Sequence, residues 1–265
     1  MMKLCPLCSG SSGNSVYVGV SEYSGLLVDV GINTKRIELL LNENNIDIHN
    51  IKAILITHEH IDHVAGVKVF AKKYGIKIYA SEGTITSLRE KGIITDKHEF
   101  EILTSKEKNL GFAEVRPFFT SHDCSQGTGY VISGEDGESV AVCTDLGYVS
   151  DEVKQALCGC KSVVIESNHD VMMLQNGPYP YYLKRRILSN VGHLSNDSCA
   201  ELLPYLVNNG TKNIVLSHLS EKNNIPELAR QTALYSFEKN SMKENVDFNL
   251  FVAPKINSKV IGLID

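Results

Sequence analysis

The chain has 265 residues, of which 43% are hydrophobic and 22% charged, and it includes 20 glycines but only 7 prolines. This length suits one large α/β domain or two small ones, and the composition is ordinary for a globular protein with a substantial core. The net charge of −5 argues against a broadly basic nucleic-acid-binding surface, although it does not exclude a local one beside metal ions.

The N-terminus shows no targeting or membrane segment. Its first six residues read MMKLCP, without the apolar region of a secretion signal, and no later stretch approaches the length needed to cross a bilayer. We therefore expect a cytoplasmic protein that makes no contact with a membrane.

The cysteines do not indicate a disulfide framework. There are seven of them, an odd number, in a chain without a secretion signal. Cys5 and Cys8 have the spacing of a redox or zinc pair, but no second pair of matching spacing follows. We expect most of the cysteines to be small buried residues, and the role of this pair stays open.

Hydrophobic patterns divide the rest of the chain into short strands and helices. The runs 16–20 and 25–31 predict a hairpin, and Thr34 can cap the helix that follows them. Inside a later helix, Pro204 predicts a kink or an early end, because proline donates no backbone hydrogen bond. Further strands are expected at 53–57, 76–79, 99–103, 113–119, 129–132, 139–143, 162–166, 214–217 and 248–252, and further helices at 64–74, 82–90, 151–157, 181–188, 196–206 and 226–237.

The order of these elements predicts the architecture. Two rounds of strands followed by helices fit two sheets packed face to face with helices on the outside. No Pro/Ser-rich linker and no shift in composition divides the chain. We therefore predict a single α/β domain over residues 1–265.

The most informative stretch is the run His58-x-His60-x-Asp62-His63, which directly follows the apolar residues 53–56. A turn after a strand lets alternate side chains point toward one place, so His58 and His60 can bind one metal while Asp62 and His63 bind another. A lone histidine is more often an ordinary polar side chain, but packing hardly explains four ligand-type residues at this spacing. The run predicts a two-metal hydrolase.

Three further ligand candidates, His122, Asp145 and His218, each follow an apolar run. Any one of them alone could be an ordinary polar residue, but together with the histidine run they complete a dinuclear site. Two metals bridged by a carboxylate lie about 3.5–4 Å apart. The resulting ligand sets are His58, His60 and His122 for metal one, Asp62, His63 and His218 for metal two, and Asp145 as the bridge.

Asp29 occupies a similar place at the end of an early strand, just before Gly31. No position in either ligand set is left for it. We therefore expect Asp29 to orient a ligand histidine through a hydrogen bond.

The order of these residues resembles that of the metallo-β-lactamase superfamily, which has an αββα four-layer sandwich and a binuclear metal site. The likeness spans nearly the whole chain and keeps each ligand position. Asp145 resembles the bridging aspartate of hydrolases such as glyoxalase II and RNase Z, which true β-lactamases lack. His60 stands where flavodiiron proteins carry glutamate, and the interval from Asp145 to His218 is too short for the extra domain of the β-CASP nucleases.

Within the superfamily, the chain is most similar to the YycJ/WalJ-like family. The shared segments are 9–15, 166–170, 192–196 and 216–220. No flexible arm of the RNase Z kind is evident. The resemblance implies a cytoplasmic metal-dependent nuclease that degrades double-stranded DNA from 5′ to 3′ and takes part in DNA repair.

The chemistry expected of such a site is phosphodiester hydrolysis. A hydroxide shared by two divalent metals would attack phosphorus in line, and the metals would neutralise the charge that builds on the other oxygens. Asp62 can both bind metal two and steer the proton of the nucleophile. His193 lies in a turn before a helix that Ser195 can cap. It is structural, or it contacts a phosphate, or it is the acid that protonates the leaving oxygen.

Several other residues are candidates for substrate contacts. Ser11, Ser12 and Asn14 lie in a loop whose polar groups suit a phosphate or sugar, although a plain turn explains this loop nearly as well. Asn168 and His169 follow an apolar strand and resemble a wall of the site that is specific to the family.

The strongest basic cluster is Lys184-Arg185-Arg186, with Tyr179, Tyr181 and Tyr182 close before it. Phosphate pairing plus base stacking would explain this composition. A solvated helix face beside buried tyrosines would explain it too, and both interpretations stay open.

Other functions remain compatible with the sequence. A small-molecule hydrolase that acts on a cyclic phosphodiester, thioester or lactone would use the same metals, and so would an RNA-directed nuclease. A binding module with a degenerate site has less support, because little physical reason would then keep seven polar ligands together. Nitrogen and oxygen ligands admit Zn, Mn or Fe, and the sequence indicates no protein partner.

Overall fold

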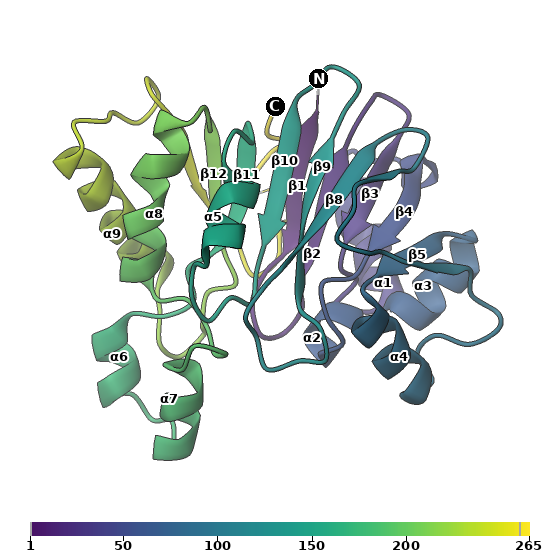
Figure 1. Cartoon of the computed structure of the whole chain (residues 1–265), viewed down its shortest axis with the longest axis horizontal. Helices are drawn as coiled ribbons and strands as arrows, with labels where there is room; N and C mark the ends of the chain where they lie inside the picture. The colour runs from purple at the N-terminus through teal and green to yellow at the C-terminus, as the bar shows by residue number, and fades with distance from the viewer. Residues whose placement is uncertain (1, 260) are drawn as a thin grey trace.

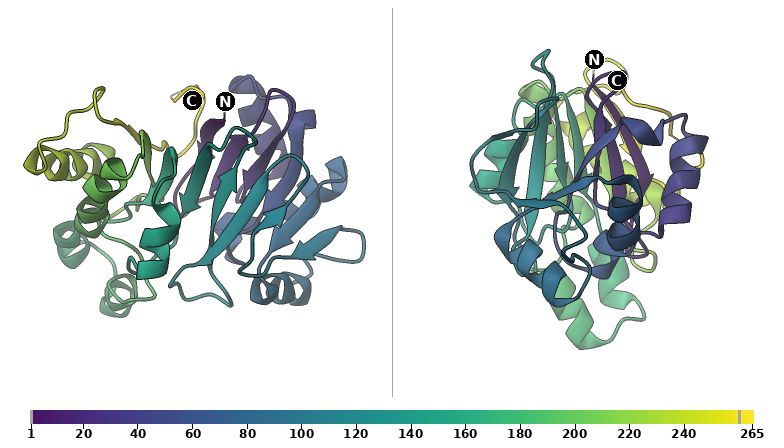
Figure 2. Two further views of the ribbon diagram at one scale, coloured as in Figure 1. Left: turned by 45° about the horizontal axis from the view of Figure 1, so that its top comes forward. Right: turned by 90° about the vertical axis from the view of Figure 1, so that its right-hand side faces the viewer.

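The computed structural model describes residues 2–259 and 261–265. Two β-sheets pack face to face and helices cover their outer faces, which gives four layers in the order α, β, β, α (Figures 1 and 2). The two chain ends lie together at the edge opposite α2 (Figure 1). The predicted αββα sandwich is confirmed. Among the described residues, no helix has the length and apolar character that a membrane crossing requires.

The first sheet contains the first six strands in sequence order. The strands β1 to β3 pair antiparallel, as the predicted hairpin requires, and β3 to β6 pair parallel. Their bounds are β1 Lys3–Cys8, β2 Ser15–Gly19, β3 Gly25–Val28, β4 Ile51–Leu55, β5 Lys77–Ala80 and β6 Phe100–Ile102.

The second sheet has the order β13-β12-β11-β10-β9-β8-β7. The strands β10 to β13 pair parallel, whereas β7 to β10 pair antiparallel. Their bounds are β7 Lys108–Asn109, β8 Glu114–Phe119, β9 Thr128–Ser133, β10 Ser139–Cys143, β11 Ser162–Glu166, β12 Asn213–Ser217 and β13 Asn249–Val252.

Helices lie outside both sheets, with α1, α3 and α4 beside the first and α5, α8 and α9 beside the second (Figure 1). The helices α6 and α7 extend beyond the sheet edge at the end where α2 lies. The bounds are α1 Thr34–Glu43, α2 Ile61–Val64, α3 Val67–Tyr74, α4 Glu82–Glu90, α5 Asp151–Leu157, α6 Val171–Asn176, α7 Tyr181–Ile187, α8 Asn196–Asn208 and α9 Pro226–Lys239, with a short 3-10 helix at Ile48–Asn50.

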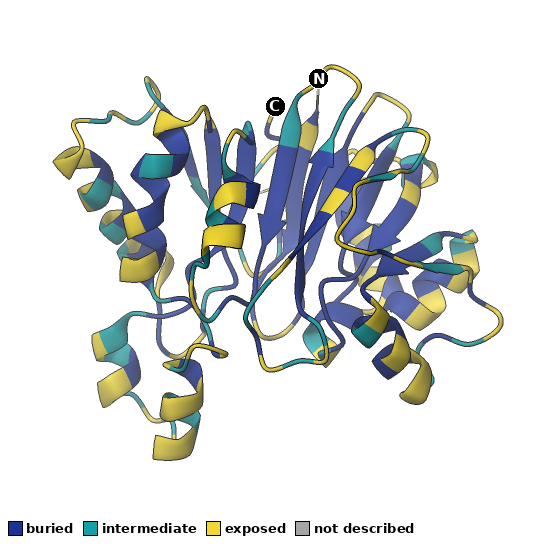
Figure 3. Ribbon diagram, viewed as in Figure 1, coloured by how far each residue is buried: buried dark blue, intermediate teal, exposed yellow. Residues whose placement is uncertain are grey.

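Several apolar runs of the sequence, among them β2, β3, β11 and β12, become strands that are buried on both faces, whereas β8 contains both buried and exposed residues (Figure 3). Successive side chains of a strand point to opposite faces, so neighbours belong to different core layers. In β4, Ile54 packs toward the helices while Leu55 packs between the sheets. In β11, Val163 packs toward the helices outside the second sheet, and Val164 packs between the sheets. Three apolar layers therefore hold the sandwich together and fix the ends of the strands.

Two predictions near the N-terminus were incomplete. Residues Lys3–Cys8 form an edge strand that the sequence analysis did not predict, and both Cys5 and Cys8 are buried in it. The cap of α1 is Asn33 instead of Thr34, because the Asn33 side chain accepts a hydrogen bond from the backbone N–H of Arg36.

Two helix predictions also need correction. The expected helix at 64–74 is broken at Gly66, where a Cβ would lie only 2.1 Å from the Ile32 carbonyl oxygen. The chain must pass close to that loop, which only glycine permits. Pro204 does not end α8, which continues to Asn208 with Leu203 and Leu206 buried against the second sheet. This packing outweighs the one hydrogen bond that proline forfeits.

Candidate metal centre

The candidate metal centre lies where strands of both sheets end at one edge. Asp29 directly follows β3, and His58 follows β4 after a short turn. Asp145 and His218 follow β10 and β12, two parallel strands of the second sheet that lie on either side of β11. His122 follows β8. Because β8 and β10 are both antiparallel to β9, they run in the same direction, so His122 reaches the same edge as Asp145. Residues far apart in the sequence therefore converge.

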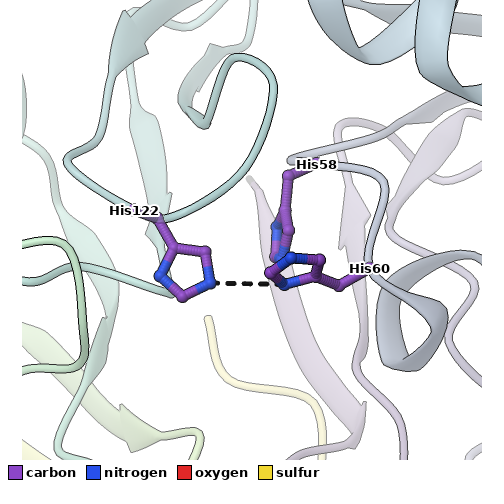
Figure 4. A group of neighbouring side chains, drawn as sticks. All are labelled: His58, His60 and His122. Atoms are coloured by element: carbon purple, nitrogen blue, oxygen red, sulfur yellow. Dashed lines mark hydrogen bonds between the residues drawn. The ribbon is translucent and has the colours of Figure 1, made fainter. Parts of the chain in front are cut away.

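The first cluster consists of His58, His60 and His122, whose rings face one another (Figure 4). Their ring centroids lie between 4.5 and 5.1 Å apart, and His122 Nε2 is 3.3 Å from His60 Nδ1. The other nitrogen of His122, Nδ1, donates to the Gly192 carbonyl at 3.0 Å. This bond fixes the tautomer, so Nε2 presents a lone pair to the cluster.

The second cluster consists of Asp62, His63 and His218. Asp62 Oδ2 lies 3.6 Å from His63 Nε2 and 3.7 Å from His218 Nε2. Each histidine is held from behind by a buried carboxylate, with His63 Nδ1 2.7 Å from Asp29 and His218 Nδ1 2.7 Å from Glu166. The Nε2 atoms therefore face Asp62.

Asp145 lies between the two clusters and is almost completely buried. Its Oδ2 is 3.0 Å from His63 Nε2, and its Oδ1 is 3.7 Å from His122 Nε2. It also groups with His58 and His63 as a third set of mutually close ligand atoms. One carboxylate therefore reaches both clusters.

The donor atoms fit divalent metal ions. Two ligands about 2.0–2.2 Å from one metal lie roughly 3–3.6 Å apart, which is close to the spacing within both clusters. His58 Nε2 and His218 Nε2 are buried and have no hydrogen-bond partner among the described residues. Buried polar atoms normally have a partner, so these two nitrogens point to cations.

Burial and charge act in opposite directions in this centre. Burial, with His63 nearby, lowers the pKa of His58 well below its usual value. Burial also opposes protonation of His218, but Asp145 and Asp62 raise its pKa to about 10. At Asp145, His218 and His63 overcome burial and lower the pKa well below the usual value. The carboxylates therefore favour positive charge between the clusters, which metal cations would supply.

The backbone of the centre is strained at three residues that lie one or two positions beyond the ends of strands. Asp29, Asp145 and His218 have φ values of 62°, 56° and 56°. Residues other than glycine seldom adopt this left-handed conformation, and such strain concentrates at functional sites. The turn at each strand end directs the side chain toward the centre.

Glu166 is a buried residue of the centre to which the sequence analysis assigned no role. Its Oε1 accepts from His218 at 2.7 Å and lies 2.8 Å from His193 Nδ1, while Oε2 accepts from the backbone N–H groups of Leu146 and Leu194. Burial opposes its ionisation, but His193 and His218 lower the pKa of Glu166 to about 2. In the sequence, the one feature that could have pointed to Glu166 is its position as an acidic residue at the end of the apolar strand β11.

Two further polar side chains support the histidine run. The Thr57 hydroxyl donates to Asp29 at 2.8 Å and lies 3.1 Å from His58 Nδ1. Asn14, predicted to contact substrate, is buried, with Nδ2 3.1 Å from His63 Nε2 and its backbone N–H donating to the Asp62 carbonyl. This position favours support of the run over a substrate contact.

The other predicted substrate residues divide into exposed and buried groups. Ser11 and Ser12 are exposed in the loop after β1. Asn168 is buried and donates to the His218 carbonyl at 2.8 Å, and His169 is only 1% exposed. Burial lowers the pKa of His169 to about 4, so this ring is neutral. These two residues lie behind the centre, which favours a supporting role for Asn168.

The three basic residues of α7 have different partners. Arg186 forms an ion pair with Asp123, a residue whose carboxylate lies 3.4 Å from His122 Nε2. Lys184 donates to the Gln175 carbonyl. Arg185 lies over the ring of Tyr181, its guanidinium carbon 5.9 Å from the centroid. The predicted alternative with buried tyrosines is wrong, because Tyr181 and Tyr182 are each 75% exposed.

The comparison with known families and proteins gives consistent matches. The model of the beta-lactamase superfamily domain matches residues 26–219. Exodeoxyribonuclease YycJ of Bacillus anthracis is 39% identical over 256 residues, which cover 96% of this chain and 96% of that protein. Exodeoxyribonuclease WalJ of Streptococcus pneumoniae serotype 2 (strain D39 / NCTC 7466) is 41% identical over 248 residues, which cover 92% and 91%.

A solved structure shares the fold over the full length. The metallo-beta-lactamase fold protein YhfI from Bacillus subtilis has a TM-score of 0.70, and the match covers 100% of both chains. Its sequence identity is 15%, so the likeness concerns the fold alone.

Proposed function

Because the chain belongs to the metallo-β-lactamase superfamily, and within it to the YycJ/WalJ-like family, we propose that it degrades double-stranded DNA from 5′ to 3′ in DNA repair. Family membership makes it a metal-dependent hydrolase. The observation that carries the proposal is the position of Asp145, whose carboxylate reaches both His/Asp clusters. That position suits a binuclear centre, and the relatives' names point to DNA.

The proposed cofactors are two divalent ions, either Zn or Mn, with Fe also compatible with nitrogen and oxygen ligands. The first would be held by His58, His60 and His122, and the second by Asp62, His63 and His218. When bound, such ions supply a reactive water near neutral pH and positive charge for the phosphodiester oxygens.

Asp62 is the ligand residue best placed to act on the nucleophile. Its side chain is 20% exposed, whereas those of His63 and His218 are almost completely buried. Its carboxylate therefore lies at the surface of the centre that substrate reaches. There it can accept a hydrogen bond from the attacking water and hold that water in line with phosphorus.

His193 is the proposed general acid. Its Nδ1 bonds to the ionised carboxylate of Glu166, which leaves Nε2 to hold a proton for the leaving oxygen. The side chain is 14% exposed and its ring centroid lies 5.0 Å from that of His122. The acid and the first metal cluster would therefore meet the same phosphodiester.

The proposed DNA-contacting surface is the outer face of α7. Tyr181 and Tyr182 offer exposed rings for base stacking, and Arg185 beside them offers charge for the backbone. The ion pair of Arg186 with Asp123 connects this helix to the loop that carries His122. A strand bound along α7 would therefore lead into the centre.

The proposal is tested with purified protein supplied with Mn or Zn. The substrates are end-labelled duplex DNA, single strands, RNA, bis-p-nitrophenyl phosphate and a thioester, and Asp62→Asn is the inactive control. We expect stepwise release of nucleotides from the 5′ ends of duplex DNA. Cleavage of the small esters without cleavage of any polynucleotide would overturn the nuclease assignment in favour of a small-molecule hydrolase.

A further inference from the structure

A cavity of about 440 Å³ lies beside the second metal cluster. Residues from four parts of the chain line it: the loop after β1, the segment that leads into α1, Ala65 directly after α2, and the segment after β13. The lining residues that matter here are Ser12, Gly13, Gly31, Arg36, Lys255 and Ile256. None of the catalytic or metal-binding roles assigned above falls on these residues.

The wall between this cavity and the metal centre is thin. Gly13 and Gly31 line the cavity, while Asn14 and Asp62 lie directly behind them. The backbone N–H of Asn14 donates to the Asp62 carbonyl, and a Cβ at Gly31 would lie 1.8 Å from that same oxygen. Only glycine allows this approach, so the cavity lies within a few ångströms of the second cluster.

Two cationic side chains line the cavity. Arg36 is exposed in the first turn of α1, and within the described residues its side chain forms no ion pair or hydrogen bond. Lys255 is 58% exposed and pairs with Glu221 at 2.6 Å. An exposed ion pair of this kind contributes little stability, so Lys255 can exchange its partner for an anion.

We propose that this cavity binds a phosphate of the nucleic-acid strand, one or two nucleotides from the bond that is cut. The inference rests on the proposed nuclease function and names a contact of that same substrate. Successive nucleotides rise about 3.4 Å along a duplex strand, so a phosphate there would be a near neighbour of the scissile one.

The lining suits a nucleotide in two ways. The Arg36 guanidinium and the Lys255 ammonium can pair with phosphate oxygens, and Ser12 adds a hydroxyl. Ile32 and Ile256 give the cavity an apolar part against which a sugar or base can pack. Its volume is within the range of ordinary small-ligand sites.

The carboxylate of Glu221 contacts two lining residues of the cavity, Lys255 and Ser12. Hydrogen bonds from Lys255 and Ser12 lower its pKa, so the side chain is ionised. This carboxylate competes with an incoming phosphate for the same two donors. Removal of its charge is therefore expected to strengthen phosphate binding, opposite to the effect of removing either cation.

The test measures binding of metal-loaded protein to a short DNA duplex with phosphorothioate linkages, prepared with either a 5′-phosphate or a 5′-hydroxyl. The variants are Arg36→Gln with Lys255→Gln, and Glu221→Gln alone. Lys52→Gln is the matched control, because Lys52 is an exposed cation near the start of β4, at the opposite end of the strand from the centre. Metal content and thermal unfolding check that each variant is intact.

We expect the double variant to bind about tenfold more weakly, with a flatter salt dependence, whereas Glu221→Gln binds more tightly and Lys52→Gln is unchanged. A loss confined to the 5′-phosphorylated duplex would assign a terminal phosphate, and an equal loss on both would assign an internal one. Unchanged binding by the double variant would overturn the cavity's role alone. Failure of the wild type to bind or cut any polynucleotide would overturn the nuclease proposal and this inference together.

Discussion

The two halves of the sandwich supply the metal centre in different ways. The first half contributes four ligand-type residues in one short run after β4, whereas the second contributes single residues after β8, β10 and β12. Each of the two proposed ligand sets needs both halves, because each joins residues of the run to one histidine of the second sheet. The positions of the ligands in the run are set by one local turn of the chain. The positions of His122, Asp145 and His218 depend on how the strands of the second sheet pair.

The halves also differ in how they hold their histidines. In the first half, Asp29 bonds to a single ring, that of His63. In the second half, Glu166 bonds to two rings, those of His218 and His193. We therefore expect Asp29 to affect metal affinity alone, and Glu166 to affect both metal affinity and turnover.

The largest effect is expected from the residue that joins the two clusters. Asp145→Asn preserves the shape of the side chain but removes the charge that faces both His63 and His122. We expect a loss of about a thousandfold in kcat/KM and a loss of bound metal, measured on a phosphodiester substrate and by elemental analysis. Wild-type metal content together with wild-type activity would contradict a shared carboxylate.

The second prediction separates the two partners of Glu166. His193→Ala is expected to lower kcat by about a hundredfold or more without loss of metal, whereas His218→Ala loses metal. Glu166→Gln should reduce both kcat and the amount of bound metal, and excess metal should restore the bound metal but not kcat. Elemental analysis beside steady-state kinetics makes the distinction. Loss of metal or of the fold in His193→Ala would show that this histidine is structural.

The third prediction concerns the anchor of the first half. Asp29→Asn is expected to weaken metal affinity about 10–100-fold, because the Asp29 carboxylate fixes the ring of His63. Excess metal should then restore kcat, in contrast to Glu166→Gln. Metal titration of both variants tests the comparison directly. A kcat that stays low at saturating metal would give Asp29 a part in the chemistry as well.

The sequence was sufficient for the run and for most of the elements, although it did not predict β1, β7 or α6. His58 to His63 are adjacent, so their convergence follows from one turn, and apolar strands reveal His122, Asp145 and His218 by position. The role of Glu166 could not be predicted, because a sequence does not distinguish a buried acid that bonds to two histidines from an ordinary acid at the end of a strand. The cavity formed by Arg36 and Lys255 could not be predicted, since these residues meet only through the tertiary fold.

Local geometry accounts for the remaining differences. The spacing of Cys5 and Cys8 is that of a redox or zinc pair and left their role open, and both residues are buried in the edge strand β1. The break at Gly66 depends on how closely the chain between α2 and α3 approaches the loop that carries Ile32. The hydrophobic pattern of the sequence contains no information about this distance. The cap at Asn33 depends on one side-chain rotamer.

A smaller effect is expected at α7, outside both halves of the centre. Neutralising Lys184, Arg185 and Arg186 should weaken DNA binding about tenfold at low salt and flatten its salt dependence. Part of this effect will be indirect, because Arg186 also holds Asp123 near His122. Arg185→Gln alone isolates the direct contact. An unchanged salt slope in the triple variant would remove α7 from the DNA-binding surface.

The smallest effect is expected from the thiols of the first half. Burial raises the pKa of Cys5 and of Cys8 to about 12, so neither forms a thiolate near neutral pH. Both should resist a thiol reagent in the native protein and react after unfolding, and Cys5→Ala with Cys8→Ala should retain bound metal. Rapid native labelling of this pair would support a redox role instead.

The most direct test of the central claim is a crystal structure of the metal-loaded protein, with the ions located by anomalous scattering. We predict two ions about 3.5–4 Å apart, one held by His58, His60 and His122 and the other by Asp62, His63 and His218, with Asp145 bound to both. One ion per chain at saturating metal, or two ions that Asp145 does not bridge, would contradict this account.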